Sequence, residues 1–300
     1  MSGERAANIQ APLLNVRTMQ FQTGDRMTKS RGKIEIGFIG GGNMAEAMVR
    51  GLLASGRAAS SLIVAEPDSA RRRALARRHR VATSADNAEV VRAARTIVLA
   101  VKPQILGEVV AGLAQLVTAR QLFVSIAAGV MLARLEKGLG GAARVIRVMP
   151  NTPCLVGRGA SVICAGRRAT AADVKLVRRM FAAVGDAHVV DDEKLMHVVT
   201  ALSGSGPAYV YRFAEALVEA ATRAGLESGL ASALTYQTIA GAAAMMIETG
   251  TEPAELRRAV SSPGGTTLAG LGALDANGFA RIVGAAVAAA ARRSIELGKG

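Results

Sequence analysis

Short apolar runs alternate with helical patterns along the first two thirds of the chain. The runs that are typical of strands cover residues 34–39, 62–65, 96–101, 122–127 and 145–149. Runs of this length, bounded by turn residues, indicate buried strands, and their alternation with helices indicates a parallel sheet with helices on both faces. The stretches 160–164, 171–183 and 188–190 could extend the same sheet as strand, helix and strand. The pattern therefore predicts an α/β domain.

The hydrophobic pattern changes after Asp192. Long helical stretches follow, at 207–224, 230–249, 253–260, 267–274 and 278–297. Small residues dominate their faces, so we expect these helices to pack closely and to interlock with a partner subunit. The change predicts two domains, an α/β domain at 33–192 and an all-helical domain at 193–300. The longest stretch without charge, 228–247, carries Ser, Thr, Tyr and Gln, and we interpret it as an interface helix rather than a membrane span.

Residues 1–32 are basic and have no apolar stretch of the kind that a secretory signal needs. Their composition is compatible with a transit peptide. The interpretation that we favour is a disordered leader, or a start assigned too early, because Met27 lies just before the first predicted strand.

The chain carries a formal charge of +14, which by itself suggests a polyanionic partner. Its arginine clusters at 71–73 and 77–78 lack the stacking aromatics of nucleic-acid modules, since aromatic residues make up only 3% of the chain. We therefore interpret them as a solvated helix face and expect no nucleic-acid partner. Cys154 and Cys164 form neither a metal spacing nor a disulfide framework, so we expect no metal and a cytoplasmic setting.

A glycine-rich fingerprint, Gly40-x-Gly42-x-x-Ala45, follows the first strand and precedes a helix. In this context Gly40 permits a tight turn, and Gly42 lets the backbone approach a diphosphate at the helix N-terminus. The motif predicts a dinucleotide site. A glycine turn without a ligand is the alternative.

The second strand ends in an acid, Glu66, at the position that binds a ribose 2′-hydroxyl and repels the 2′-phosphate of NADP. Arg71 and Arg72 are close enough in sequence to reverse this preference, and Ser69 could contact the phosphate. Glu66 could instead cap the next helix. The choice between NADH and NADPH therefore stays open.

Two further strand ends carry candidate ligand residues. Lys102 and Pro103 follow the third strand and Asn151 follows the fifth, where parallel sheets place ligand contacts. Turn chemistry is an equally good explanation for each of them alone.

Two loops of the helical half begin helices, Ser203–Pro207 and Ser261–Thr267. Free amides at a helix start attract a carboxylate, with a stabilisation of ~0.3–2 kcal/mol. The Thr267 hydroxyl would point toward the same ligand. The alternative for either loop is a capped connection between helices.

Oxidation of an alcohol needs a base, commonly Lys or His, and the helical half offers little of either. From Met196 onward the sequence has one His, His197, and one Lys, Lys299 at the terminus. We interpret His79, His188 and His197 as structural. Reduction of an imine needs no such base, because the substrate nitrogen can arrive protonated.

Together and in this order, the motifs resemble pyrroline-5-carboxylate reductases. The matching segments are 38–44, 100–103, 149–153, 201–209 and 261–267, and the resemblance covers about residues 33 to 297. It implies an α/β N-terminal Rossmann-type parallel-sheet domain followed by an all-α C-terminal dimerisation domain. It also implies a homodimer, in some members a decamer, and hydride transfer from NADPH or NADH to C5 of Δ1-pyrroline-5-carboxylate, which gives L-proline.

The resemblance also implies a role for each motif residue. Thr267 would hydrogen-bond the ring nitrogen, as proton donor or as positioner. The substrate carboxylate would be held by Ser262, Gly264, Gly265 and Thr266. The cofactor would be bound by Gly40, Gly42, Asn43, Met44, Glu66, Ser69, Arg71, Lys102, Pro103 and Asn151.

Three alternatives stay open. A β-hydroxyacid dehydrogenase would need a catalytic Lys on the helix after a glycine-rich stretch near 200, and residues 205–224 have none. A reductase of another cyclic imine would share every motif above. A basic nucleotide- or nucleic-acid-binding protein rests on charge alone and would show strongly salt-dependent binding.

Overall fold

The computed structural model describes residues 34–299, so the predicted leader at 1–32 lies outside the described residues. The strands are β1 Ile36–Ile39, β2 Leu62–Ala65, β3 Ala82–Ser84, β4 Thr96–Leu99, β5 Leu122–Ser125, β6 Arg144–Met149, β7 Gly159–Ala165 and β8 Gly185–Val190. The helices of the first part are α1 Asn43–Ala54, α2 Ser69–His79, α3 Asn87–Ala93, α4 Pro103–Leu113, α5 Leu132–Gly138 and α6 Ala171–Ala182. Those of the second part are α7 Leu195–Val199, the π-helix η4 Thr200–Gly204, α8 Gly206–Arg223, α9 Ser228–Thr249, α10 Pro253–Ala259, α11 Thr266–Ala276 and α12 Phe279–Lys299.

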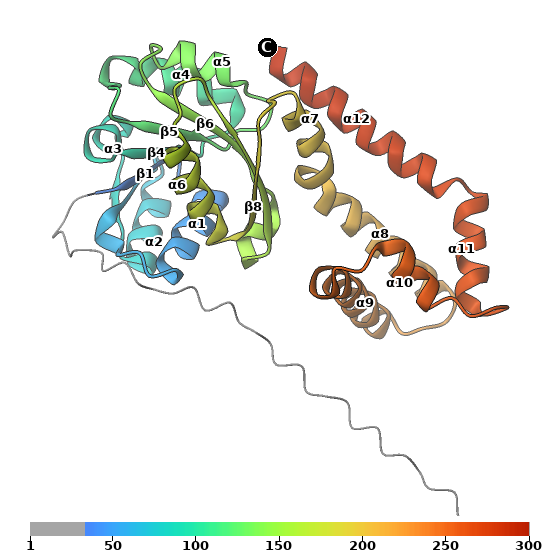
Figure 1. The fold of residues 1–300 in the computed structure, drawn as a ribbon. Coiled ribbons are helices and arrows are strands. Elements are labelled where there is room, and N and C mark those ends of the chain that lie inside the picture. Colours follow the sequence, from blue (N-terminus) through green and yellow to red (C-terminus); the bar gives the residue numbers. More distant parts are fainter. Residues whose placement is uncertain (1–33, 300) are drawn as a thin grey trace, which may run out of the picture. The chain divides into compact units, whose positions relative to one another are not determined.

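The eight strands form one sheet in the order β3-β2-β1-β4-β5-β6-β7-β8, with helices on both faces (Figure 1). The buried side chains divide into two clusters accordingly. Those of α1, α2 and α6 pack on one face, and those of α3, α4 and α5 pack on the other. The predicted α/β architecture is therefore confirmed, with the stretch after Val156 as part of the same sheet.

The last two strands run against the direction expected of a parallel sheet. β7 pairs antiparallel with β6, while β8 pairs parallel with β7. Only residues 150–158 connect β6 to β7, which is too short for the crossover that parallel neighbours need. The connection from β7 to β8 contains α6 and is such a crossover.

The edge strand β3 was not predicted from the sequence. It is three residues long, its burial rises from exposed Ala82 to buried Ser84, and it lacks an apolar run. β3 is specified by its pairing with β2, which a local pattern cannot reveal.

The second part of the chain is helical from Leu195 to Lys299, as expected. The predicted loop at Ser203–Pro207 is mostly helical, because the π-helix η4 includes Ser203 and Gly204 and only Ser205 is a bend, while Pro207 lies in the first turn of α8 as expected. The Ser205 amide donates to the Thr200 carbonyl at 2.8 Å, and the Ser203 and Thr200 hydroxyls donate to carbonyls four residues back. These bonds leave no free-amide loop there for an anion.

A buried ion pair joins the sheet to the first helical residues. Arg147 on β6 is only 1% exposed and donates to Glu193 Oε1 at 2.9 Å. The same oxygen accepts the Leu132 amide at 2.7 Å. Nearby, the His197 and Ser294 side chains share a hydrogen bond of 2.9 Å that ties α7 to α12. These contacts fix the two ends of the helical part to each other and to the sheet.

Apolar surface gathers on the helical part. Within residues 34–299, all but four of the exposed large hydrophobic residues lie between Leu195 and Leu297. By length and composition α9 could also cross a membrane, and α11 with α12 would do so as a bent pair. An apolar surface of this extent on paired helices is equally what a subunit interface presents.

Candidate functional site

The turn after β1 has the geometry that a diphosphate site needs. Gly40 has a φ of +94°, and a Cβ there would lie 2.8 Å from the Ala100 carbonyl oxygen, so a side chain is excluded. Gly42 begins α1 without a side-chain cap, and a Cβ there would meet nothing within 4 Å. The first amides of α1 therefore face open space, which a side chain on Gly42 would begin to fill. The residues present fit a dinucleotide at this helix start.

Asn43 and Met44 occupy the first turn of α1 in different ways. The Asn43 side chain accepts a hydrogen bond from the Arg71 guanidinium at 3.1 Å. Met44 is partly buried against the core cluster under α1. The Asn43 side chain therefore lies on the exposed side of this turn, whereas that of Met44 is half-buried against the core.

Glu66 connects the glycine loop to the start of α2. One carboxylate oxygen accepts the Gly41 amide and the other accepts the Asp68 amide, each at 3.0 Å. The N-cap of α2 is Asp68, which accepts the Arg71 amide at 2.6 Å. The alternative in which Glu66 caps this helix is therefore wrong, and its carboxylate lies between β1 and β2.

Arginines surround this acid. The Arg71 side chain donates to the Gly41 carbonyl and lies 3.7 Å from the Glu46 carboxylate. Arg72 donates to the carbonyls of Glu66 and Pro67, each at 2.7 Å. Ser69 is exposed at the first position of α2. The β2 end thus presents the carboxylates of Glu66 and Asp68 and two guanidinium groups, which is compatible with either cofactor.

Two acidic residues next to the glycine loop, Glu46 and Asp68, escaped the sequence reasoning. Glu46, on the first turn of α1, pairs with Arg78 and with His79 at 3.0 Å. The hydrogen bond from His79 lowers the pKa of the Glu46 carboxyl, against the opposing effect of burial. Asp68 was recognisable, since Pro67-Asp68 before a helix is a cap signature. Glu46 was not, because its partners lie more than 30 residues away.

Lys102 and Pro103 follow β4, the strand beside β1. Lys102 is the N-cap residue of α4 and Pro103 is its first residue, and both are exposed. Since the Cβ position of Gly40 touches Ala100, the two strand ends adjoin. Both residues therefore lie at the same sheet edge as the glycine loop.

Asn151 has its side chain committed to the protein. Its Nδ2 donates to the Ser203 carbonyl at 3.1 Å, and its Oδ1 accepts the Ala160 amide at 2.9 Å. These contacts hold the start of β7 and the π-helix η4 together. These two bonds favour a structural role for the Asn151 side chain. Only the second N–H of its Nδ2 group remains for a ligand.

The predicted substrate residues form an exposed turn before α11. Gly265 is the N-cap of α11 and has no side chain to cap it, so the first amides of the helix are free. Gly264 has a φ of +70°, and a Cβ on Gly265 would lie 2.5 Å from the Ser262 hydroxyl. Ser262 and Thr266 are exposed and Thr267 is half-buried. Gly264 thus has a conformation that favours glycine, and Gly265 lies tightly against Ser262, in a turn that presents amides and hydroxyls.

The structure brings one predicted group together and leaves the other apart. The cofactor candidates gather where β1, β2 and β4 end. Among residues 34–299, no hydrogen bond links the turn before α11 to any of them. In the same described range no cluster of three His, Cys, Asp or Glu is placed to hold a metal.

Comparison with known proteins identifies both parts. The family described as pyrroline-5-carboxylate reductase dimerisation matches residues 193–297, and the family described as NADP oxidoreductase, coenzyme F420-dependent, matches 35–129. The pyrroline-5-carboxylate reductase of Pseudomonas aeruginosa is 44% identical over 262 residues, which cover 87% of this chain and 96% of that protein. The enzyme of Pisum sativum is also 44% identical and covers the same share of this chain and 95% of its own.

Solved structures agree with this assignment. The pyrroline-5-carboxylate reductase of Coxiella burnetii superposes with a TM-score of 0.85 at 37% identity, over 89% of this chain and 100% of its own. The Plasmodium falciparum pyrroline carboxylate reductase with NADP bound gives a TM-score of 0.79 at 34% identity, over 90% and 100%. These relatives span the described fold and both candidate sites, and the chain belongs to the pyrroline-5-carboxylate reductase family.

Proposed function

We propose that the chain reduces Δ1-pyrroline-5-carboxylate to L-proline with NADPH or NADH, the final step of proline biosynthesis. The observation that carries this proposal is the free-amide turn Ser262–Thr267 in a chain 44% identical to a pyrroline-5-carboxylate reductase over 87% of its length. The turn offers the hydroxyl and amide donors that a small carboxylate needs.

The cofactor is assigned to the edge where β1, β2 and β4 end. The free amides of α1 at Gly42, Asn43 and Met44 would hold the diphosphate. Glu66, Ser69 and Arg71 would contact the adenosine ribose, and Lys102, Pro103 and Asn151 would line the path toward the nicotinamide. When bound, the nicotinamide supplies the hydride.

The substrate is assigned to the turn before α11. Ser262, Gly264, Gly265 and Thr266 would hold its carboxylate, because their donors meet at an uncapped helix start. Thr267 would hydrogen-bond the ring nitrogen, either donating the proton or positioning an imine that arrives protonated. Holding the ring in this way fixes the electrophilic carbon for reduction, which is catalysis by orientation rather than by a strong base.

A homodimer would cover the apolar surface of the helical part. The exposed hydrophobic residues coincide with the dimerisation match at 193–297, which supports a subunit interface at α8–α12 over a membrane span for α9. We further propose domains at 33–192 and 193–300, a cytoplasmic enzyme that can assemble into a decamer, and neither nucleic acid nor membrane as a partner.

The family assignment disfavours the alternatives to different degrees. A β-hydroxyacid dehydrogenase lacks its lysine here, since residues 205–224 have none. A basic binding protein would have no need of the glycine geometry at Gly40 or Gly265. A reductase of another cyclic imine would use the same turn, and substrate comparison distinguishes the two.

The test is turnover with the purified chain. Nicotinamide absorbance is followed with pyrroline-5-carboxylate and either cofactor, and the product is identified by chromatography against L-proline. A six-membered cyclic imine carboxylate is the comparison substrate. Faster reduction of the larger ring would replace the proposed substrate, and binding of DNA without any turnover would replace the enzyme.

A further inference from the structure

Glu46, on the first turn of α1, contacts both ends of the neighbouring helix α2. One carboxylate oxygen, Oε1, accepts the Arg78 guanidinium and lies 3.0 Å from His79 Nε2, in the last turn of α2. The other oxygen, Oε2, lies 3.7 Å from Arg71 Nη2, in the first turn. Residues seven and eight apart share one face of a helix, so a single carboxylate can reach all three side chains. The hydrogen bond from His79 lowers the pKa of the Glu46 carboxyl, which keeps it ionised at neutral pH.

Two hydrogen bonds hold the Arg71 guanidinium on the side of Glu46. Its Nε donates to the Gly41 carbonyl, and its Nη2 donates to Asn43 Oδ1 at 3.1 Å. Both acceptors belong to the turn that begins α1. A cofactor bound at the glycine loop would therefore meet a guanidinium whose charge is already opposed by the Glu46 carboxylate.

The Glu66 carboxylate is held differently. Its two oxygens accept backbone amides, and no ion pair joins it to Arg71 or Arg72 within residues 34–299. Arg72 donates instead to backbone carbonyls. Within the same residues, the acid that would repel a 2′-phosphate is thus without a cationic partner, while the base that would attract one is paired with Glu46.

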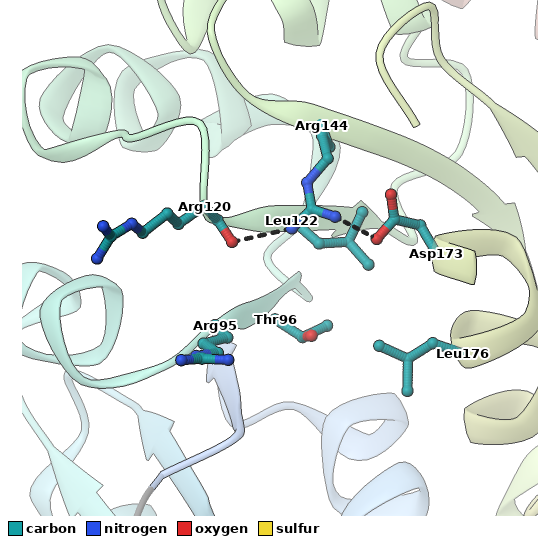
Figure 2. Close-up of a pocket in the computed structure, with 7 residues that line it drawn as sticks. All are labelled: Arg95, Thr96, Arg120, Leu122, Arg144, Asp173 and Leu176. Atoms are coloured by element: carbon teal, nitrogen blue, oxygen red, sulfur yellow. Dashed lines mark hydrogen bonds and ion pairs between the residues drawn. The ribbon is translucent and has the colours of Figure 1, made fainter. Parts of the chain in front are cut away.

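The arginines drawn in Figure 2 cannot take the place of Arg71. Arg95, Arg120 and Arg144 lie at the amino ends of β4, β5 and β6, whereas the cofactor candidates gather where β1, β2 and β4 end. Figure 2 also shows the Arg144 guanidinium bonded to Asp173 and the Arg120 guanidinium directed away from it. These side chains cannot contribute to the cofactor site, so the guanidinium groups beside the glycine loop are those of α2.

We propose that Glu46 determines cofactor specificity through Arg71: it competes with the 2′-phosphate of NADP for this guanidinium and so favours NADH over NADPH. The inference rests on the proposed cofactor site at the glycine loop. Carboxylate and phosphate form the same charge-assisted hydrogen bonds with a guanidinium, so pairing with one weakens the attraction for the other. NAD has no 2′-phosphate and does not enter this competition. Glu46 is thus a positioning residue, because it acts on the cofactor through another side chain.

Equilibrium binding of the oxidised cofactors tests the proposal. Dissociation constants for NADP⁺ and NAD⁺ are measured by calorimetric titration of the full-length protein without an imine, so the result does not depend on which substrate is reduced. Glu46→Gln removes the charge and keeps an oxygen that Arg78 and His79 can still bond. Glu108→Gln, the same change at an exposed acid of α4, is the matched control. Glu46→Gln is also made in an Arg71→Met background.

We expect Glu46→Gln to strengthen NADP⁺ binding relative to NAD⁺ binding by about three- to fivefold, the effect of one partly exposed ion pair. Glu108→Gln should leave the ratio of the two dissociation constants unchanged. In the Arg71→Met background Glu46→Gln should not change that ratio, a result that a merely structural role of Glu46 would not give.

Three results would overturn the proposal while leaving the cofactor site intact. They are an unchanged ratio in Glu46→Gln, an equal shift in Glu108→Gln, and the same shift in the Arg71→Met background. Relatively weaker NADP⁺ binding in Glu46→Gln would also refute it, because Glu46 would then present Arg71 to the phosphate. A chain that binds neither dinucleotide would refute the proposed cofactor site, and this inference with it.

Discussion

Replacement of Glu66 by Ser should shift cofactor preference toward NADPH. The Glu66 carboxylate is fixed by the amides of Gly41 and Asp68, each at 3.0 Å, at the strand end where a ribose 2′-substituent would lie. Two unit charges ~4 Å apart interact by ~1 kcal/mol in water and ~4 kcal/mol at an effective dielectric constant of 20. Because Glu66 is partly exposed, we take ~1–2 kcal/mol for its repulsion of a 2′-phosphate.

That free energy corresponds to a rise of about 5- to 30-fold in the ratio of kcat/KM for NADPH to kcat/KM for NADH. The ratio is measured at saturating pyrroline-5-carboxylate. Asp68→Asn is the matched control, since it removes a neighbouring charge and retains the N-cap of α2. In Asp68→Asn the ratio of kcat/KM for the two cofactors should stay within about threefold of the wild-type value, because salt screens the charge of an exposed carboxylate. An unchanged ratio in Glu66→Ser, or an equal rise in Asp68→Asn, would refute a specific role for Glu66 at the ribose.

Three further predictions concern the substrate turn and the stability of the fold. Thr267→Ala should lower kcat by about ten- to hundredfold, the value of one hydrogen bond to a charged group, and should leave cofactor binding, measured by fluorescence titration, unchanged. The control Thr249→Ala, at an exposed helix end, should change neither quantity. Loss of cofactor binding in Thr267→Ala would remove Thr267 from the substrate site. Burial and the neighbouring Arg147 lower the pKa of His197 below the ordinary 6.5. The unfolded chain therefore binds the proton more readily, and this contribution to stability is complete above pH 6.5 and is lost as the pH falls through the folded pKa. Chemical denaturation across that range should show a smaller loss for His197→Gln than for the wild type, and identical pH slopes would contradict the assignment. Thr170→Ala should reduce the free energy of unfolding by ~0.5–2 kcal/mol, since it opens the capping box of α6; no change in denaturation midpoint would mean that Asp173 caps the helix alone.

The sequence predicted those features that a short segment determines by itself. Gly40 and Gly42 lie in the turn between one strand and the next helix, where the fingerprint puts them, and Gly40 has the positive φ that such a turn needs. The buried central strands β1, β2, β4, β5 and β6 were predicted from local hydrophobic periodicity in the same way, whereas the edge strand β3 was not. The helical part was equally clear, because its pattern continues over some hundred residues.

Features that depend on distant contacts were missed or misjudged. Ser203–Pro207 has the composition of a loop. In the structure, however, Gly204 lies against Met149 and the Ser203 carbonyl accepts a hydrogen bond from Asn151, and this part of the segment is a π-helix. The side chain of Asn151 was expected to face a ligand and is held by two backbone groups instead. A helix cap was the alternative role for Glu66, but Asp68 caps α2 and Glu66 also binds the Gly41 amide, 25 residues away. In each case the competing interaction comes from another strand or helix, which local propensity does not include.

The most direct test of the account is a turnover measurement with pyrroline-5-carboxylate and each nicotinamide cofactor, with the product identified by chromatography. The account predicts stoichiometric conversion of reduced cofactor and imine into L-proline, and abolition or severe loss of this conversion when the turn glycine Gly265 is replaced by Val. Folded, cofactor-binding protein that forms no proline with either cofactor would contradict it.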